Sequence, residues 1–241
     1  THLTCAGYEI INSYAQEQLE FRNSPTLELD SKVANLGKIY GVVKRINDGL
    51  LKNKPAQDLK ELTVSFLPAM AQMTLLTVHL QQTLQKDPTE CLQTALQMIL
   101  STYFLNATDS NILNASGSAL LAVFFGLFDR SNDNENCLLN ENLLHKVALP
   151  ILLAPHVAGV IVPSQGRQLQ DALVSARFAV FVPILARLIE ILGPVSISTL
   201  GPLIVQISRL HDCRYLTCRE ELVRLVSILV RVSGLQEVLT L

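Results

Sequence analysis

The chain has 241 residues, of which 49% are apolar and only 17% are charged, and its formal net charge is −2. Charged residues make up about a quarter of an average soluble domain. We therefore expect the segments of this chain to be buried on more than one side, as the inner helices of elongated stacks are. The near-neutral balance excludes the strong positive field of a nucleic-acid-binding protein, and the lack of tryptophan argues against binding by base or sugar stacking.

Apolar residues recur at helical spacing along almost the whole chain, and no segment shows the alternation of a strand. The sequence Asp87-Pro88-Thr89-Glu90 is typical of a helix start, with Asp87 as the cap, Pro88 at the first helical position and Glu90 reaching back to the N–H of the cap. In the first half we expect helices over residues 3–22, 28–51, 56–65, 68–86 and 88–105.

A polar loop at residues 129–136, rich in Asn, Asp and Ser, divides the chain. It separates an N-terminal helical stack (1–128) from a C-terminal helical stack (137–241) that we expect to continue the first. We expect one more helix before this loop, over residues 112–128. After the loop we expect helices over residues 138–147, 149–161, 167–192 with a bend near Pro183, 195–211 and 217–233.

Four prolines, Pro68, Pro150, Pro183 and Pro202, each lie inside a run of aliphatic residues. Proline suits the first turn of a helix, because the N–H groups of that turn make no hydrogen bond within the helix. Elsewhere in a helix, proline causes a kink. The pattern predicts the starts or kinks of helices that are stacked between other helices.

Gly117, Gly159 and Gly201 are spaced 42 residues apart, which raises the question of a repeat. The segment from Leu92 to Phe128 contains a helix, a short loop and then Asn114-Ala115-Ser116-Gly117 before an aliphatic helix, and it resembles an armadillo repeat junction. Val232-Ser233-Gly234-Leu235 looks similar, and the prolines are equally similar to those of HEAT repeats. The resemblance covers about a third of the chain. It implies a right-handed stack with a groove lined by the third helix of each repeat.

The predicted fold is therefore all-α, an α-solenoid of armadillo/HEAT-like helical repeats, with a compact irregular helical domain as the alternative. The five cysteines are odd in number and show no disulfide spacing, so we expect a reduced protein of the cytoplasm or nucleus. The most apolar window, 147–163, has two internal prolines, Pro150 and Pro155, and is shorter than the ~20 residues that a spanning helix needs, so no membrane contact is expected.

No catalytic, cofactor-binding or metal-binding motif is predicted. His211, Asp212, Cys213 and Cys218 have the residue types of zinc ligands, but they lack the second pair of ligands that a structural zinc site brings. Glycine-rich phosphate loops and nucleophile elbows are also missing from the sequence. We therefore expect a protein that is not an enzyme and that has no small-molecule substrate.

Two sets of residues are candidates for binding a protein partner. Arg177, Arg187, Arg224 and Arg231 stand almost alone on aliphatic helices, either as occupants of a solvent-facing stripe or as the lining of a groove that grips acidic or carbonyl groups. The terminal segment carries the apolar Leu235, Val238, Leu239 and Leu241, whereas the end of a helical stack needs a polar outer face. We expect this end to be an interface, in a fragment of a longer protein.

The function expected from these residues is that of a non-enzymatic scaffold that binds a peptide or helix of a partner within a larger complex. Two alternatives remain open. One is a helical domain with an apolar pocket for a lipid or small molecule. The other is a helical regulator of a nucleotide-binding enzyme, which would use an exposed loop arginine such as Arg130 or Arg214.

Overall fold

The computed structural model describes residues 5–13, 34, 38, 41, 56–107, 109–128, 141–155, 157, 159, 172–208 and 219–239. Every regular element within these ranges is a helix, and none is a strand. The predicted all-α class is confirmed. The helices predicted over 3–22 and 28–51 lie mostly outside the described residues, but residues 5–13, 34, 38 and 41 are helical.

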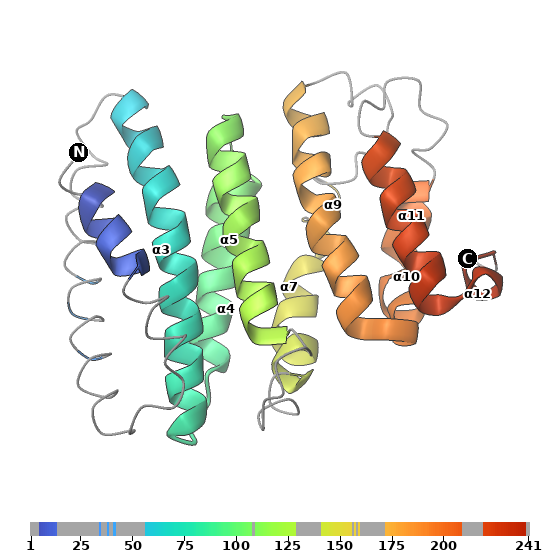
Figure 1. Cartoon of the computed structure of the whole chain (residues 1–241), viewed down its shortest axis with the longest axis horizontal. Coiled ribbons are helices and arrows are strands. Elements are labelled where there is room, and N and C mark those ends of the chain that lie inside the picture. Colours follow the sequence, from blue (N-terminus) through green and yellow to red (C-terminus); the bar gives the residue numbers. More distant parts are fainter. Residues whose placement is uncertain are drawn as a thin grey trace.

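The helices stand side by side in two layers (Figure 1). The layer nearer the viewer holds, in order along the row, α3 (Ala56–Thr83), α5 (Ser110–Phe128), α9 (Ala172–Leu192) and α11 (Arg219–Ser233). The layer behind holds α4 (Thr89–Gln97) with its π-helical continuation η1 (Met98–Phe104), η2 (Leu144–Ala148) with α7 (Leu149–Leu152), and α10 (Ser196–Ser208). The short turn η4 (Gly193–Val195) joins α9 to α10, and α12 (Leu235–Leu239) follows α11. The chain thus alternates between the layers, and each helix of the nearer layer packs on the next.

Three of the four prolines lie inside helices: Pro68 in α3, Pro183 in α9 and Pro202 in α10. Pro150 alone lies in a first turn, that of α7. The predicted break between residues 65 and 68 is therefore wrong, because α3 runs through Pro68 without interruption. A proline inside a helix costs about 3 kcal/mol. Burial of the aliphatic and aromatic neighbours on both sides of Pro68 offsets this, since each contributes about 1.5–3 kcal/mol.

The turn before α4 follows the predicted start in part. Asp87 Oδ1 accepts hydrogen bonds from the backbone N–H of Thr89 at 3.0 Å and from its hydroxyl at 2.6 Å. These two bonds hold the pKa of the Asp87 carboxyl below its ordinary value, and the bond from the Thr89 hydroxyl has the larger effect. Helix α4 begins at Thr89, so Pro88 rather than Asp87 stands at the cap position, and this cap makes no side-chain hydrogen bond.

Two glycines let α5 approach both of its neighbours closely. A side-chain carbon added at Gly117 would overlap Val180 Cγ1 of α9, and one added at Gly126 would meet Leu75 Cδ2 of α3 at 2.6 Å. Gly159 of the same 42-residue series differs from Gly117, since it is exposed with nothing within 4 Å of such a carbon. The spacing of 42 residues therefore does not mark an equivalent packing position.

The two halves of the chain share one core. Across the boundary, the rings of Phe104 and Phe181 lie 6.1 Å apart, and α5 packs along α9. The buried Arg177 of α9 donates from Nη2 to the carbonyl of Ala107, in the turn between η1 and α5, at 3.3 Å. The loop predicted at 129–136 lies outside the described residues.

Three helical stretches within the described residues are long and apolar enough to cross a membrane, judged by length and composition alone. They are Lys60–Thr83, Ser110–Phe128 and Ser175–Val205. Inside the structure, 61%, 50% and 56% of their most apolar windows are buried. At least half of each window therefore packs on other parts of the same chain.

Candidate functional site

Helix α11 forms the end of the nearer layer. Its three leucines, Leu222, Leu225 and Leu229, are buried in the shared core, and Ile228 and Val232 pack against that core. Figure 1 shows α9 on one side of α11 and α12 on the other. One flank of α11 is thus committed to the fold, which leaves the opposite flank for solvent or a partner.

That opposite flank is apolar. Val223 and Val226 are 58% and 44% exposed, and Val230 is half-buried. Together with the exposed Arg219, these residues follow one another at intervals of four, three and four, which places them in a line along the helix. We call these four residues the α11 flank.

The short helix α12 adds two exposed leucines, Leu235 at 59% and Leu239 at 76%. Val238 is half-buried and packs against the core. Of the four terminal residues predicted as an interface, the structure therefore exposes two and turns one inward, while Leu241 lies outside the described residues. We call Val223, Val226, Leu235 and Leu239 the C-terminal apolar surface.

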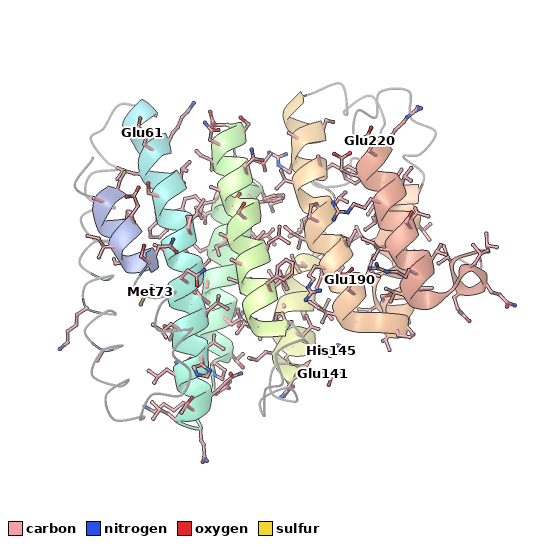
Figure 2. The ribbon with its side chains drawn as sticks, viewed as in Figure 1. Glu61, Met73, Glu141, His145, Glu190 and Glu220 are labelled. Carbon is pink, nitrogen blue, oxygen red and sulfur yellow. The ribbon has the colours of Figure 1, made fainter. Side chains whose placement is uncertain are left out.

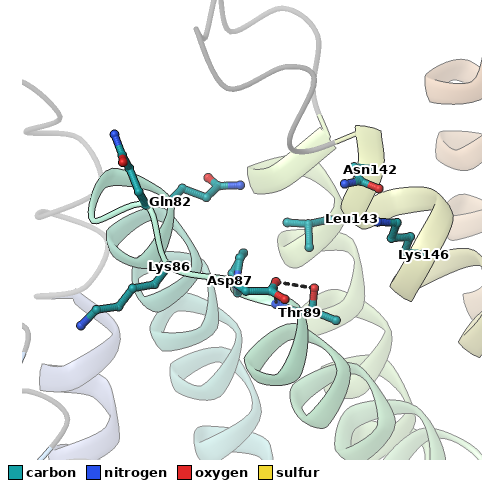
Figure 3. A pocket seen from close by; sticks show the side chains of 9 residues that line it. Gln82, Lys86, Asp87, Thr89, Asn142, Leu143 and Lys146 are labelled. Carbon is teal, nitrogen blue, oxygen red and sulfur yellow. Dashed lines mark hydrogen bonds between the residues drawn. The ribbon is translucent and has the colours of Figure 1, made fainter.

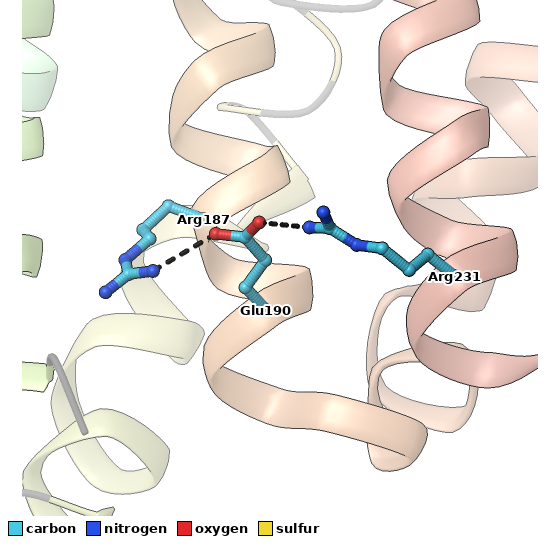
Figure 4. A network of polar contacts seen from close by, with 3 residues as sticks. All are labelled: Arg187, Glu190 and Arg231. Atoms are coloured by element: carbon cyan, nitrogen blue, oxygen red, sulfur yellow. Dashed lines mark hydrogen bonds and ion pairs between the residues drawn. The ribbon is translucent and has the colours of Figure 1, made fainter. Parts of the chain in front are cut away.

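Two of the four candidate arginines meet at one carboxylate (Figure 4). Glu190 of α9 accepts from Arg187 Nη1 at 3.1 Å through Oε2 and from Arg231 Nη2 at 2.6 Å through Oε1. The Arg187 guanidinium also lies 4.5 Å from the ring centroid of Phe125 in α5. Glu190 itself lies between α9 and α11 (Figure 2). This network links three helices of one layer, and such partly exposed pairs contribute modestly to stability.

The other two arginines lie in different surroundings. Arg177 is only 8% exposed, and its guanidinium donates a hydrogen bond to the Ala107 carbonyl inside the structure. It is therefore not placed to contact a partner. Arg224 is exposed on α11 and forms no ion pair with the residues that the structure describes. The four arginines therefore do not line one groove.

Two surface cavities of about 460 Å³ lie beside the turn between α3 and α4. One is lined mostly by polar residues and opens between Lys86, Asp87, Asn142 and Lys146, with the bonded pair Asp87 and Thr89 at its edge (Figure 3). The other lies along α3 and α4 and is lined in part by all three methionines of the chain, Met70, Met73 and Met98, and by Cys91. Burial raises the pKa of the Cys91 thiol, so this thiol is less reactive than an exposed one.

Within the described residues, no group of three or more His, Cys, Asp or Glu side chains gathers as a metal site would require. The cluster His211, Asp212, Cys213 and Cys218 lies outside these residues, as do Arg130 and Arg214. Cys5 and Cys91 are free thiols.

Sequence reasoning missed Val223 and Val226. A signal for them was present, because α11 carries two aliphatic lines, the leucines 222, 225 and 229 and the valines 223, 226 and 230. A helix with a single buried face needs only one such line. The second line is the signal in the sequence for a second apolar surface on this helix.

No known protein family, curated protein or solved structure matches the chain. The resemblance to armadillo and HEAT repeats thus rests on the residues quoted for it.

Proposed function

We propose that the chain is a non-enzymatic scaffold that binds a protein partner through its C-terminal apolar surface. The observation that carries this proposal is the exposure of four aliphatic side chains, Val223, Val226, Leu235 and Leu239, at one end of a layered array of helices. Exposed apolar patches on soluble proteins commonly mark interaction sites. Covering a leucine as exposed as Leu239 is worth about 1–2 kcal/mol.

The alternation of helices between two layers supports a stack of the armadillo or HEAT type. In such stacks each helical pair contacts its neighbours, and the terminal unit needs a polar outer face to remain soluble. Here the end at α11 and α12 exposes Val223, Val226, Leu235 and Leu239. A partner that covers it would supply the polar outer surface.

We further propose that the chain works in the aqueous cytoplasm or nucleus rather than in a membrane. The exposed stripe of α5 begins with Asn111, Asn114 and Ser118, which favour water over hydrocarbon. Extraction of cell membranes with alkaline carbonate should leave the chain in the supernatant. Its retention in the membrane pellet would contradict this placement.

The scaffold proposal is tested by affinity capture compared across variants. The chain, the double variant Leu235→Glu/Leu239→Glu and the control Ile10→Glu are expressed in the same cells, and bound proteins are quantified by mass spectrometry. Ile10 is a matched control because it is an aliphatic residue, 69% exposed, in the N-terminal helical segment 5–13.

The expected result is a protein that is captured by the parent chain and by Ile10→Glu but is lost with the double variant. This protein is then purified and must bind the chain directly. The thermal midpoint of the double variant should stay within a few degrees of the parent, since both leucines are exposed. A capture profile that is the same for all three chains would refute the proposal.

A further inference from the structure

The cavity that runs along α3 and α4 has the size of a small-molecule site. Its volume is about 460 Å³, and ligand pockets commonly measure about 300–1,000 Å³. A short turn joins α3 to α4, so the two helices run in opposite directions (Figure 1). One end of the cavity therefore lies near the turn, and the other end lies two to three helical turns away from it. We call it the α3–α4 cavity.

The end of the α3–α4 cavity that lies away from the turn is apolar and adaptable. It is lined by Met70 and Met73 of α3 and by Met98, the first residue of the π-helix η1. Methionine is unbranched and polarizable, so it adjusts its shape to an apolar ligand. Single π-helical turns also occur frequently at functional sites. This end of the cavity is suited to an alkyl chain.

The polar groups that α3 brings to the same cavity offer hydrogen-bond acceptors. The hydroxyls of Thr74 and Thr77 donate their protons to the carbonyls of Met70 and Met73, both at 2.7 Å, so these hydroxyl oxygens retain only acceptor capacity. The amide oxygen Oε1 of Gln81, nearer the turn, is buried and accepts no hydrogen bond within the part of the chain that the structure describes. A buried carbonyl without a donor is unfavourable, and a ligand N–H that reached it would relieve that cost.

The charge of the lining selects the sign of the ligand. Asp87 and Glu90 add two carboxylates near the turn, and no Lys, Arg or His is among the described residues that line the cavity. Asp87 already accepts from Thr89 and is attracted to Lys146. The Glu90 side chain is exposed and forms no hydrogen bond or ion pair with the residues that the structure describes, so its carboxylate is available. The cavity therefore favours a cation and disfavours a fatty acid or another anion.

We propose that the α3–α4 cavity binds a linear alkylammonium ion, an organic cation with an apolar chain. The ammonium group donates hydrogen bonds to the Glu90 carboxylate and the Gln81 amide oxygen, and the chain passes Thr77 toward the methionines. The helix rises about 12 Å from Glu90 to Met98, which is close to the length of an octyl chain. This inference goes beyond the scaffold function and takes up the small-molecule alternative that the sequence left open.

The test is isothermal titration calorimetry at neutral pH with three ligands of one chain length. Octylamine carries the positive charge, octanol is neutral and octanoate is negative. Each is titrated into the parent chain, into Glu90→Gln and into the control Glu61→Gln. Glu61 is a matched control because it is an exposed glutamate of α3 that does not line the cavity. Circular dichroism checks that both variants keep the helix content of the parent.

We expect octylamine to bind the parent chain at a ratio of one per chain and about tenfold more tightly than octanol, because a hydrogen bond to a charged group is worth about one decade in affinity. Octanoate should bind more weakly than octanol. Glu90→Gln should remove the preference for octylamine and leave octanol unchanged, whereas Glu61→Gln should bind all three ligands as the parent does.

The two described free thiols locate the ligand. Cys91 lines the cavity and Cys5 does not, and both are half-buried. Octylamine should therefore slow the alkylation of Cys91 by iodoacetamide and leave that of Cys5 unchanged, as measured by peptide mass spectrometry. Equal affinity for octylamine and octanol, an unchanged preference in Glu90→Gln, or an unprotected Cys91 would overturn the inference. Each of these results is independent of the scaffold function, which is tested at Leu235 and Leu239 at the other end of the array.

Discussion

The close approach of α5 and α9 at Gly117 makes a sharp prediction about stability. A methyl group added at Gly117 would overlap Cγ1 of Val180, and Gly117 is itself buried. Valine in a helix has one strongly preferred rotamer, so Val180 cannot turn its methyl aside cheaply. The two helices must therefore separate, and overpacking of this kind costs about 1–3 kcal/mol.

Alanine also favours the helix over glycine by up to ~1 kcal/mol, which offsets part of this cost. We expect Gly117→Ala to lower the free energy of unfolding by about 1–2 kcal/mol. For a chain of this size the thermal midpoint should fall by about 2–8 °C. Thermal unfolding followed by circular dichroism measures this shift, and urea unfolding gives an independent midpoint.

Gly126 supplies the matched control. The added carbon would meet Leu75 at its two terminal methyl groups, 2.6 and 2.7 Å away, and these lie at the end of a flexible side chain. Gly126→Ala should therefore cost less than Gly117→Ala. Val180→Ala removes the clashing methyl, so it should cost less stability in the Gly117→Ala background than in the parent chain. The reasoning is refuted if Gly117→Ala is as stable as the parent, or if Val180→Ala has the same cost in both backgrounds.

Three further predictions concern single side chains. Arg177→Met should lower the free energy of unfolding by about 1–3 kcal/mol in urea, because the buried Ala107 carbonyl loses a hydrogen bond from a charged group; an unchanged urea midpoint would contradict this. The Lys60 ammonium, 2.8 Å from Asp109, holds the pKa of that carboxyl below its ordinary value, so its stabilisation is present above the ordinary pKa and is lost as the pH falls through the lowered one. Asp109→Asn should thus weaken the fall of the thermal midpoint between about pH 5 and pH 2, and an identical acid profile would refute it. Pro183→Ala should raise the urea midpoint by an amount equivalent to about 1–3 kcal/mol, because Pro183 is an exposed residue inside α9 and alanine restores a helical N–H; a lower midpoint would show that the packing of α9 depends on the proline.

Much of the helical framework follows from local pattern. The periodicity of α5 and α11 located both helices to within about two residues, because each contrasts a buried line with exposed polar residues. The prediction failed at Pro68, where local propensity favours an end but burial on two sides keeps the helix intact. Tertiary packing outweighs propensity at such a position.

The candidate site was harder to predict than the helices. Helix α9 is aliphatic almost all round, so its sequence does not show which side faces water. Arg177 and Arg187 lie on this helix ten residues apart, yet one bonds to a buried carbonyl and the other to Glu190 near the surface. Those partners come from other parts of the chain or from the local turn, and only the folded arrangement identifies them. The exposure of Leu235 and Leu239, in contrast, could be predicted from the sequence. The last unit of a helical stack normally carries polar residues on its outer face, and these leucines depart from that pattern.

The two glycines of α5 also have a mechanical consequence. Because Gly117 and Gly126 have no side chain, the backbone of α5 lies directly against Val180 of α9 and Leu75 of α3, and these contacts set the spacing of the three helices. A sideways displacement of α3 is therefore transmitted through α5 to α9, because there is little free space between these helices. The middle of the row is stiff, whereas α12, with no buried residue of its own, can yield. A partner that binds the C-terminal apolar surface, as proposed above, would therefore meet the compliant end of the chain and not its rigid centre.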